Sequence, residues 1–252
     1  NAAIRGVART AINQYGIKVI GIEEGYRGLM QGLGHELTAN ELSGILTRGG
    51  TILGTSREKP FKIGKEAVNA IKENYKKWNL DALVCIGGNG TNTTASYLAE
   101  EGLNVIGLPK TIDNDLEYTD HTPGFGSAAK YVAATMQEII RDSSVYSVDS
   151  VTIVEVMGRH AGYIAVNTGI ATGALCVLVP EQPWDIDKDV IARIKETQAE
   201  GKKNFLIIVA EGAGKALKIA EEIQAKTGLD TRGTVLGHVQ RGGSPSMRDR
   251  VV

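Results

Sequence analysis

The chain has 252 residues, of which 42% are hydrophobic, and this is enough for one large core or for two lobes that each bury their own. Its 28 Lys and Arg residues nearly balance 29 Asp and Glu residues, so the sequence lacks the overall positive charge that drives nonspecific binding to nucleic acid. No apolar run approaches the roughly 20 residues that span a bilayer, and the N-terminus lacks the pattern of a signal peptide.

The two cysteines indicate a reducing compartment. Cys85 and Cys176 lie in the apolar runs LVCIG and ALCVLV, where a thiol behaves as a small hydrophobic group and a disulfide is not expected. We therefore expect a soluble, cytoplasmic protein without a membrane or nucleic-acid partner. Because the chain begins without a methionine and stops soon after a helix is expected to start, we also expect a fragment of a longer protein.

Short apolar runs rich in β-branched residues alternate with helical patterns along the chain. We expect strands at residues 17–22, 80–88, 103–109, 150–158, 174–180, 204–212 and 234–239. We expect helices at residues 1–15, 62–77, 91–101, 125–141, 187–199 and 213–227. This alternation predicts an α/β fold in which helices cover both faces of a mainly parallel sheet. A polar loop near Pro123 and Gly124 is the expected boundary between two lobes.

Polar motifs follow several of these strands, and in open α/β sheets ligands bind outside the carboxyl ends of the strands. The first motif in chain order is TRGGTILGTSR, residues 47–57. Its glycines permit close approach of the backbone to a ligand, and Arg57 could reach a phosphoryl group that is being transferred. An ordinary surface loop explains the motif equally well.

The second motif is IGGNGTNTTA, residues 86–95, a Gly-rich turn between an apolar strand and a helix. Glycines let backbone N–H groups approach a phosphate, and the N-terminus of the helix adds donors and a favourable dipole. The alternative is a plain turn from strand to helix in which Thr91 is the N-cap. The motif is neither a Walker A sequence nor a GxGxxG fingerprint.

The third motif is PKTIDND, residues 109–115. Of its two carboxylates, one could accept a proton from a hydroxyl group while the other holds a metal ion that bridges phosphates. The alternative is a capped turn in which Asp and Asn side chains satisfy local backbone N–H groups, and on this motif alone the turn is favoured. The cation of Lys110 suits a negatively charged substrate.

Two further motifs add arginines. EVMGRHAGYIA, residues 155–165, places Arg159 where a strand gives way to a helix, either for phosphate oxygens or for a nearby carboxylate. TRGTVLGHVQRGGSPSMRDR, residues 231–250, brings two arginines and a histidine around a Gly-Gly turn, which favours an anion site.

Taken together and in this order, the motifs resemble those of the phosphofructokinase family, over nearly the whole chain. The resemblance implies two Rossmann-like lobes of mainly parallel sheet flanked by helices. It also implies transfer of a phosphoryl group from ATP or pyrophosphate to the 1-hydroxyl of fructose 6-phosphate, with Mg²⁺. By this resemblance the donor lobe comprises residues 1–124 and 240–252, and the sugar-phosphate lobe comprises residues 125–239.

The resemblance also implies roles for single residues. Asp113 resembles the catalytic base, with Thr111 beside it, and Asp115 resembles a second acid near magnesium. Arg57 and Arg159 resemble the cations that stabilise charge on the moving phosphoryl group. The positions that match sugar-phosphate ligands are Thr111, Asp115, Met157, Gly158, Arg159, Glu211, His238 and Arg241, with Arg232 reaching into a neighbouring subunit. The donor-side positions are Tyr26, Arg57, Gly88, Asn89, Gly90, Thr91 and Lys110, and a homodimer or homotetramer is implied.

The chain departs from the family pattern at positions that bear on the donor. Asn89 stands where ATP-dependent members have Asp, so it can offer magnesium an amide oxygen but no charge. Gly90 stands where pyrophosphate-dependent members have a second Asp that blocks the α-phosphate of a nucleotide, which favours ATP. Lys110 favours pyrophosphate, although a mixed group with Gly and Lys uses ATP. Ser150 replaces an inter-subunit arginine, so one contact to the sugar phosphate is expected to be lost.

We therefore expect an ATP- and Mg²⁺-dependent 6-phosphofructokinase of glycolysis. A pyrophosphate-dependent enzyme, or a kinase for another ketose phosphate such as sedoheptulose 7-phosphate, remains an alternative within the class. The alternative from another class is a non-catalytic paralogue that binds sugar phosphate or nucleotide, for which Asn89 and Ser150 are the motivation.

Overall fold

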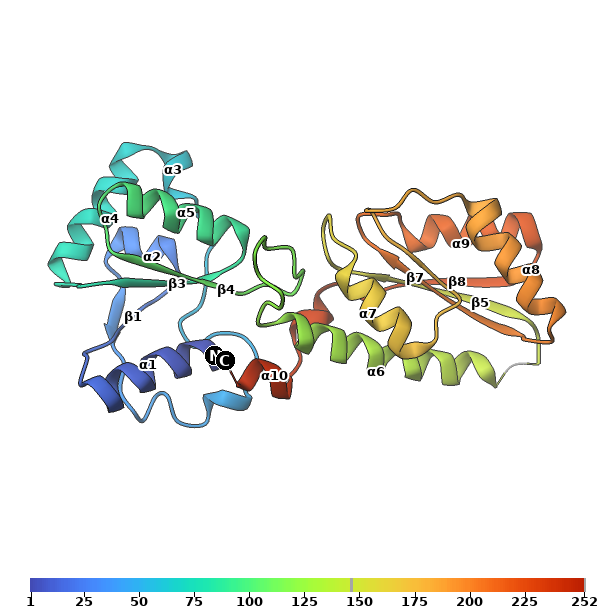
Figure 1. Cartoon of the computed structure of the whole chain (residues 1–252), viewed down its shortest axis with the longest axis horizontal. Helices are drawn as coiled ribbons and strands as arrows, with labels where there is room; N and C mark the ends of the chain where they lie inside the picture. The colour runs from blue at the N-terminus through green and yellow to red at the C-terminus, as the bar shows by residue number, and fades with distance from the viewer. Residues whose placement is uncertain (146, 252) are drawn as a thin grey trace. The chain divides into compact units, whose positions relative to one another are not determined.

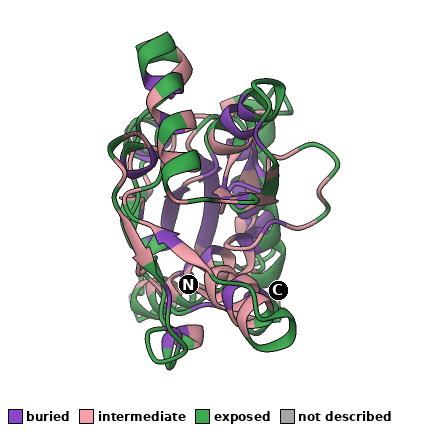
Figure 2. Ribbon diagram, turned by 90° about the vertical axis from the view of Figure 1, so that its left-hand side faces the viewer, coloured by how far each residue is buried: buried purple, intermediate pink, exposed green. Residues whose placement is uncertain are grey.

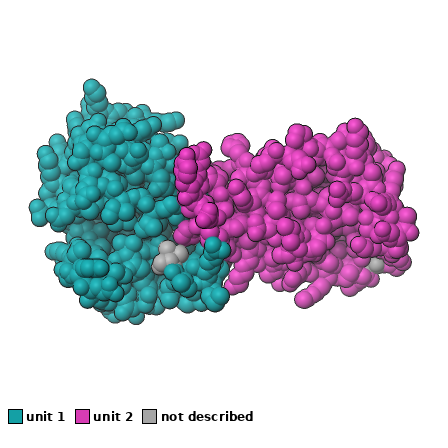
Figure 3. Space-filling model, in the orientation of Figure 1, with its two compact units in different colours: residues 1–111, 244–252 teal, residues 112–243 magenta. Residues whose placement is uncertain are grey.

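The computed structural model describes residues 1–145 and 147–251 and divides the chain into two compact units (Figure 3). Unit 1 consists of residues 1–111 with 244–252, and unit 2 consists of residues 112–243. From the sequence we placed the lobe boundaries after residues 124 and 239, whereas the compact units divide after Thr111 and Gly243. The assignment of phosphoryl donor and sugar phosphate to separate lobes stays a prediction.

Unit 1 contains two small sheets. Strands β1 (Ile20–Ile22) and β2 (Gly34–Glu36) pair antiparallel, and β3 (Leu83–Gly87) and β4 (Val105–Pro109) pair parallel. The helices of this unit are α1 (Ala2–Tyr15), α2 (Tyr26–Gln31), α3 (Pro60–Ile63), α4 (Lys65–Lys77), α5 (Asn89–Glu100) and α10 (Met247–Arg250), with a 3₁₀ turn at Ile45–Thr47. The main core packs Ile71 of α4 and Leu98 of α5 against Leu83 and Cys85 of β3. A second cluster gathers Ala8 of α1 with apolar side chains of the loop that follows β2.

Unit 2 is built on one four-stranded sheet in the order β6-β7-β5-β8, and all of its pairings are parallel. Its strands are β5 (Ser150–Val156), β6 (Cys176–Leu178), β7 (Asn204–Ala210) and β8 (Asp230–Val235). Its helices are α6 (Phe125–Ser144), α7 (Tyr163–Thr172), α8 (Ala192–Ala199) and α9 (Ala216–Thr227), with a π-helical turn at Ile186–Ile191 and a 3₁₀ turn at Gly237–Arg241.

Helices cover both faces of the unit 2 sheet, as the alternation in the sequence predicts. Successive residues of a strand point to opposite faces. Ile153 and Ile207 accordingly pack with α8 and α9, whereas Val154 and Ile208 pack with α6 and α7 (Figure 1). Figure 2 shows buried residues concentrated in the strands and exposed ones on the outer turns of the helices. A sheet buried on both faces explains why these strands are apolar throughout.

Some sequence predictions need correction. The last strand is Asp230–Val235 and not 234–239, because Gly237 takes a left-handed φ of 56° and the chain turns into a 3₁₀ helix there. The helix predicted at 62–77 is divided at Gly64, where φ is 136°. The short strand β2 was not predicted, because its sequence GHE is neither β-branched nor alternating. In the described part of the chain, no helix combines the length and the apolar character that crossing a membrane needs.

Candidate active site

The carboxyl ends of three parallel strands in unit 2 carry most of the predicted sugar-phosphate residues. Met157, Gly158 and Arg159 follow β5, and Glu211 follows β7. His238 and Arg241 lie in the 3₁₀ turn that follows β8. Since the strands are parallel neighbours, their carboxyl ends share one edge of the sheet, which is the usual place for a ligand in such folds.

The carboxylate of Glu211 fixes the backbone after β5. Its Oε1 accepts hydrogen bonds from the backbone N–H groups of Gly158 (3.2 Å) and Arg159 (2.8 Å). Arg159 has a φ of 54°, a left-handed conformation that is unusual for a residue with a side chain. A side chain at Gly212 would place its Cβ 2.2 Å from the carbonyl oxygen of Arg159, so only glycine fits there. The acid after β7 and the glycine beside it therefore hold Arg159 in a strained conformation.

Arg159 reaches the predicted catalytic base. Its Nε lies 3.4 Å from Oδ2 of Asp113. The Asp113 side chain is 8% exposed, whereas that of Arg159 is 73% exposed. The structure thus brings together two residues that the sequence assigns to the reaction, an acid held inside the fold and a cation on its surface.

The loop that carries Asp113 is organised by Asn114. Oδ1 of Asn114 accepts hydrogen bonds from the N–H (2.8 Å) and the hydroxyl (3.2 Å) of Thr122, and its Nδ2 donates to the carbonyl of Asp120 (3.3 Å). The capped turn that we considered as an alternative for this motif is therefore present, and it coexists with the pairing of Asp113 and Arg159. From the sequence, the asparagine of this motif was expected to act only in the capped turn, and no role in the reaction was assigned to it. Its tolerance for left-handed φ was the available signal.

The 3₁₀ turn after β8 is anchored from within. The buried side chain of Gln240 accepts a hydrogen bond from the N–H of Met157 (3.1 Å) and donates one to the carbonyl of Gly237 (2.9 Å). Nη2 of Arg241 lies 2.6 Å from Nδ1 of His238. Because a guanidinium only donates, Nδ1 of His238 is the acceptor in this contact. Gln240 was not predicted, and nothing in the sequence marks it as buried.

A buried acid lies below this edge of the sheet. Glu155, inside β5, accepts hydrogen bonds from Nζ of Lys215 (2.8 Å) and from the N–H of Ala216 at the start of α9 (3.0 Å). The hydrogen bond with Glu155 raises the pKa of Lys215. Sequence analysis missed this pair, although a lone acid within an apolar strand is a signal of a buried, paired charge.

The two positions that the sequence links to a neighbouring subunit differ in exposure. Arg232 lies in β8, is exposed, and its Nη2 is 2.9 Å from Oδ2 of Asp230. Ser150, which replaces the family arginine, is the first residue of β5 and is buried, and its hydroxyl donates to Oδ1 of Asn204 (2.9 Å).

In unit 1 the Gly-rich motif forms the turn between β3 and α5. The helix begins at Asn89 with Gly88 as N-cap, so the alternative in which Thr91 is the N-cap is wrong. The side chain of Asn92 donates to the carbonyls of Gly87 (2.7 Å) and Gly88 (3.1 Å), which fixes the turn from inside.

A hydrogen bond joins two residues of the predicted donor side, Tyr26 and Thr91, next to this turn. The hydroxyl of Tyr26 donates to the carbonyl of Thr91 (2.7 Å). Burial and the neighbouring Cys85 raise the pKa of Tyr26, so the phenol stays protonated and remains a donor. Burial also raises the pKa of Cys85, as expected for an inert core thiol.

Two glycines of this turn, Gly88 and Gly90, differ in the space around them. A Cβ added at Gly90 would meet no atom within 4 Å, whereas one added at Gly88 would lie 3.5 Å from Cβ of Thr111. Lys110 is exposed, and its N–H donates to the carbonyl of Gly87 (2.8 Å), so β4 ends alongside the turn. Gly88, Lys110 and Thr111 therefore lie together in unit 1.

Arg57 is exposed in the loop that precedes α3. The earlier part of its motif is held by the side chain of Asn1, whose Nδ2 donates to the carbonyl of Gly49 (3.1 Å) and whose Oδ1 accepts from the N–H of Ile52 (2.7 Å). The two predicted metal ligands, Asn89 and Asp115, belong to unit 1 and unit 2 respectively. Among the described residues, no three His, Cys, Asp or Glu side chains cluster in the manner of a metal cage.

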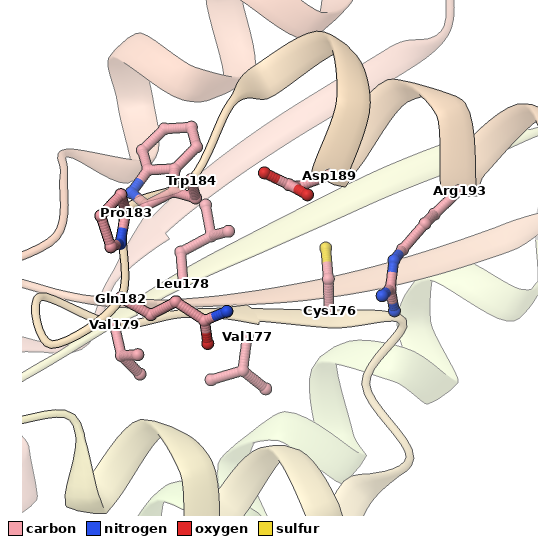
Figure 4. A pocket seen from close by; sticks show the side chains of 9 residues that line it. All are labelled: Cys176, Val177, Leu178, Val179, Gln182, Pro183, Trp184, Asp189 and Arg193. Carbon is pink, nitrogen blue, oxygen red and sulfur yellow. The ribbon is translucent and has the colours of Figure 1, made fainter.

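A cavity of about 160 Å³ lies in unit 2 beside β6 (Figure 4). Cys176, Trp184, Asp189 and Arg193 contribute to its wall. None of the predicted site residues lines it. Burial raises the pKa of Cys176 to about 11, so its thiol is protonated at neutral pH.

Comparisons with known proteins identify relatives that match the whole chain. The model of the family described as phosphofructokinase matches residues 1–252. The ATP-dependent 6-phosphofructokinases of Spirochaeta thermophila and Clostridium tetani are 44% and 47% identical, and each match covers 100% of this chain and 77% of the relative.

Two solved structures show the same fold. The Pichia pastoris phosphofructokinase in the T-state gives a TM-score of 0.89 at 35% identity, and the match covers 99% of this chain but 29% of that one. A pyrophosphate-dependent phosphofructokinase from Marinobacter aquaeolei gives 0.84 at 27% identity, covering 99% of this chain and 68% of the other. Since a pyrophosphate-dependent protein shares the fold, the fold alone does not identify the phosphoryl donor. The chain belongs to the phosphofructokinase family.

Proposed function

We propose that this chain, as part of its full-length protein, transfers the γ-phosphoryl group of ATP to the 1-hydroxyl of fructose 6-phosphate, giving fructose 1,6-bisphosphate in glycolysis. The observation that carries the proposal is the pairing of Asp113 with Arg159 at the carboxyl edge of the unit 2 sheet. The names of the relatives from Spirochaeta thermophila, Clostridioides difficile and Clostridium tetani, each an ATP-dependent 6-phosphofructokinase, support it. The two free cysteines in apolar surroundings support a cytoplasmic location.

In the proposed reaction Asp113 is the general base. The 1-hydroxyl oxygen bonds to the γ-phosphorus, the bond from that phosphorus to the bridging oxygen of ADP breaks, and the hydroxyl proton passes to Asp113. Arg159 and Arg57 stabilise the charge on the moving group. In phosphoryl transfer the protein contributes mainly positioning and charge stabilisation, which suits a site built from fixed loops at strand ends.

The sugar phosphate is proposed to bind at the same edge of the sheet. Arg241 and His238, together with Arg232 from a neighbouring subunit, supply donors for its phosphate. Met157, Gly158 and Glu211 contact the sugar. The use of Oε1 of Glu211 by two backbone N–H groups supports this, because it fixes the direction of the other carboxylate oxygen. Thr111, at the end of unit 1, lies near the transferred group.

Asp115 and Asn89 are proposed to hold Mg²⁺, and the chemistry of these donors fits. Magnesium prefers oxygen ligands, keeps several waters, and is commonly bound by one or two carboxylates together with substrate phosphates. One carboxylate and one amide oxygen meet that requirement. When bound, the ion neutralises charge on the phosphates.

The donor position is proposed to accept ATP. Gly90 leaves open space beside the first turn of α5, whereas an Asp there would place a carboxylate near the α-phosphate. Lys110 favours pyrophosphate, and this is the specific observation that supports a pyrophosphate-dependent enzyme as second candidate. Tyr26, Gly88 and Thr91 complete the donor side.

The test is a coupled assay on the full-length protein that crosses ATP and pyrophosphate with fructose 6-phosphate and sedoheptulose 7-phosphate. We expect the highest kcat/KM with ATP and fructose 6-phosphate, and no turnover after removal of Mg²⁺. Preference for pyrophosphate or for the seven-carbon sugar would replace the proposed specificity. Binding of sugar phosphate by calorimetry with no turnover under either donor would show a non-catalytic paralogue.

The active form is proposed to be a homodimer or homotetramer, because Arg232 is expected to complete the site of a neighbouring subunit. Its exposure in β8 supports this. Analytical ultracentrifugation with activity measurements across protein concentrations tests it. A fully active monomer would contradict the shared site.

A further inference from the structure

Asn114 separates the proposed base from the proposed metal ligand, in an unusual conformation. Its φ is 55°, in the left-handed region that most residues with side chains avoid. The side chain is buried, with the residue 8% exposed. Both properties belong to a residue whose neighbours fix its geometry.

Three hydrogen bonds from this side chain fasten the start of the loop to its end. Oδ1 accepts from the N–H and the hydroxyl of Thr122, and Nδ2 donates to the carbonyl of Asp120. Thr122 is fully buried, and its carbonyl accepts a hydrogen bond from the N–H of Phe125, the first residue of α6 (3.1 Å). Since Phe125 packs into the core against the sheet, the loop is tied to a rigid element.

From this geometry we propose that Asn114 is the positioning residue of the catalytic base. Its hydrogen bonds fix the loop so that the carboxylate of Asp113 stays beside Arg159. In that position the carboxylate takes up the hydroxyl proton. The inference rests on the proposed function, because it assigns a role through Asp113. Asn114 itself need not touch the substrate.

Asparagine alone satisfies all the requirements of this position. Glycine tolerates the left-handed φ but makes none of the three side-chain hydrogen bonds, and alanine neither tolerates the φ well nor makes the bonds. Aspartate keeps the acceptor but loses the donor to Asp120, and it adds a third negative charge between Asp113 and Asp115.

The main test variant is Asn114→Gly, which keeps the backbone conformation and removes the hydrogen bonds. In the full-length protein we expect kcat with ATP and fructose 6-phosphate to fall at least tenfold while both KM values stay within about threefold. A group that acts only in the transition state changes kcat and not ground-state binding. The matched control is Asn79→Gly, an exposed asparagine with a φ of 51° in unit 1, which should leave kcat unchanged.

A double-mutant cycle with Asp113→Asn separates positioning from a general structural role. If Asn114 acts through Asp113, the glycine substitution should have less than a twofold effect on the residual turnover of Asp113→Asn. Equal losses in both backgrounds would overturn the proposal, as would a kcat of Asn114→Gly within twofold of wild type. If Asn114→Gly fails to fold, Thr122→Val removes the hydroxyl donor alone. That variant should lower kcat about threefold, and an unchanged kcat would then overturn the proposal.

The outcome also distinguishes this inference from the proposed function. A wild-type protein without turnover contradicts the function itself. A wild-type protein with turnover and an equally active Asn114→Gly variant contradicts only the role of Asn114.

Discussion

Nε of Arg159 lies 3.4 Å from Oδ2 of Asp113, and the two side chains differ sharply in exposure, 73% against 8%. An ion pair with one partner in solvent contributes little to stability, because water screens the interaction. The free energy gained from this contact therefore does not offset the free energy that the left-handed conformation of Arg159 costs. A role in the reaction explains this pairing better than a role in the stability of the fold does.

Replacing Arg159 should accordingly affect turnover and not stability. We expect Arg159→Ala to lower kcat about 100-fold, the scale of losing one donor that stabilises transition-state charge. The melting temperature should change by no more than about 1 °C, because the cation of this ion pair lies in solvent and water screens its interaction. Steady-state kinetics and calorimetry on the full-length protein measure both, with Arg193→Ala on α8 as the control. A large drop in melting temperature without a change in kcat would assign Arg159 to folding instead.

The role of Asp113 can be tested without altering its shape. Asp113→Asn should lower kcat by about 10²- to 10⁴-fold, the usual contribution of a general base, while fructose 6-phosphate still binds. The matched control is Asp120→Asn, an exposed carboxylate in the same loop, which should keep wild-type turnover. Calorimetric titration separates binding from catalysis. Near-normal turnover of Asp113→Asn would remove this residue as the base.

Gly212 offers a test of the backbone around the site. Its substitution by alanine would place Cβ 2.2 Å from the carbonyl oxygen of Arg159, a backbone atom that cannot move without moving the loop. We expect Gly212→Ala to lower the free energy of unfolding by about 1–3 kcal/mol and to lower kcat together with it. Chemical denaturation and kinetics check both quantities. Wild-type values for both would show that the loop after β5 is more adaptable than its contacts indicate.

The sequence predicts the sheet of unit 2 well for physical reasons. Strands β5 and β7 are buried on both faces, so their apolar runs stand out from the amphipathic helices between them. The start of β8 was missed because Asp230–Val235 includes polar residues and reads as a turn. This segment is a strand because it pairs with the buried strand β5, and not because of its own composition.

The site divides in the same way. Residue types and their order at strand ends predict the acids and the arginines, because these groups are needed for the chemistry. Several residues that hold them in place are not predicted, because their contacts depend on the fold. Gln240 meets Met157 across 83 positions of the chain, and the roles of Asn114 and Glu155 depend equally on partners that the sequence does not reveal.

His35 provides a pH dependence that lies outside the proposed site. Nε2 and Nδ1 lie 2.8 Å and 2.9 Å from carboxylate oxygens of Glu41 and Glu23, and these hydrogen bonds raise the pKa of His35 above its ordinary value of 6.5. A raised pKa means that the charged ring stabilises the fold below pH 6.5, and that this contribution is lost as the pH rises through the raised value. The melting temperature of wild type minus that of His35→Gln should decrease by on the order of 1 °C between pH 6 and pH 8.5. The effect is small because all three side chains are exposed. A difference that does not vary with pH would contradict the assignment.

Gly90 gives the sharpest test of the donor. A side chain there meets no atom within 4 Å, and Asp in the first turn of a helix is favourable, so Gly90→Asp should fold with an unchanged or slightly higher melting temperature. Its carboxylate should repel the α-phosphate of ATP and lower kcat/KM for ATP at least 100-fold, while any activity with pyrophosphate persists. Gly90→Asn is the matched control, since it has the same shape without the charge and should cost ATP use far less. If both variants lose ATP activity equally, the volume of the side chain and not its charge excludes the nucleotide. If neither variant loses ATP activity, the α-phosphate does not approach Gly90 and the proposed donor position is wrong.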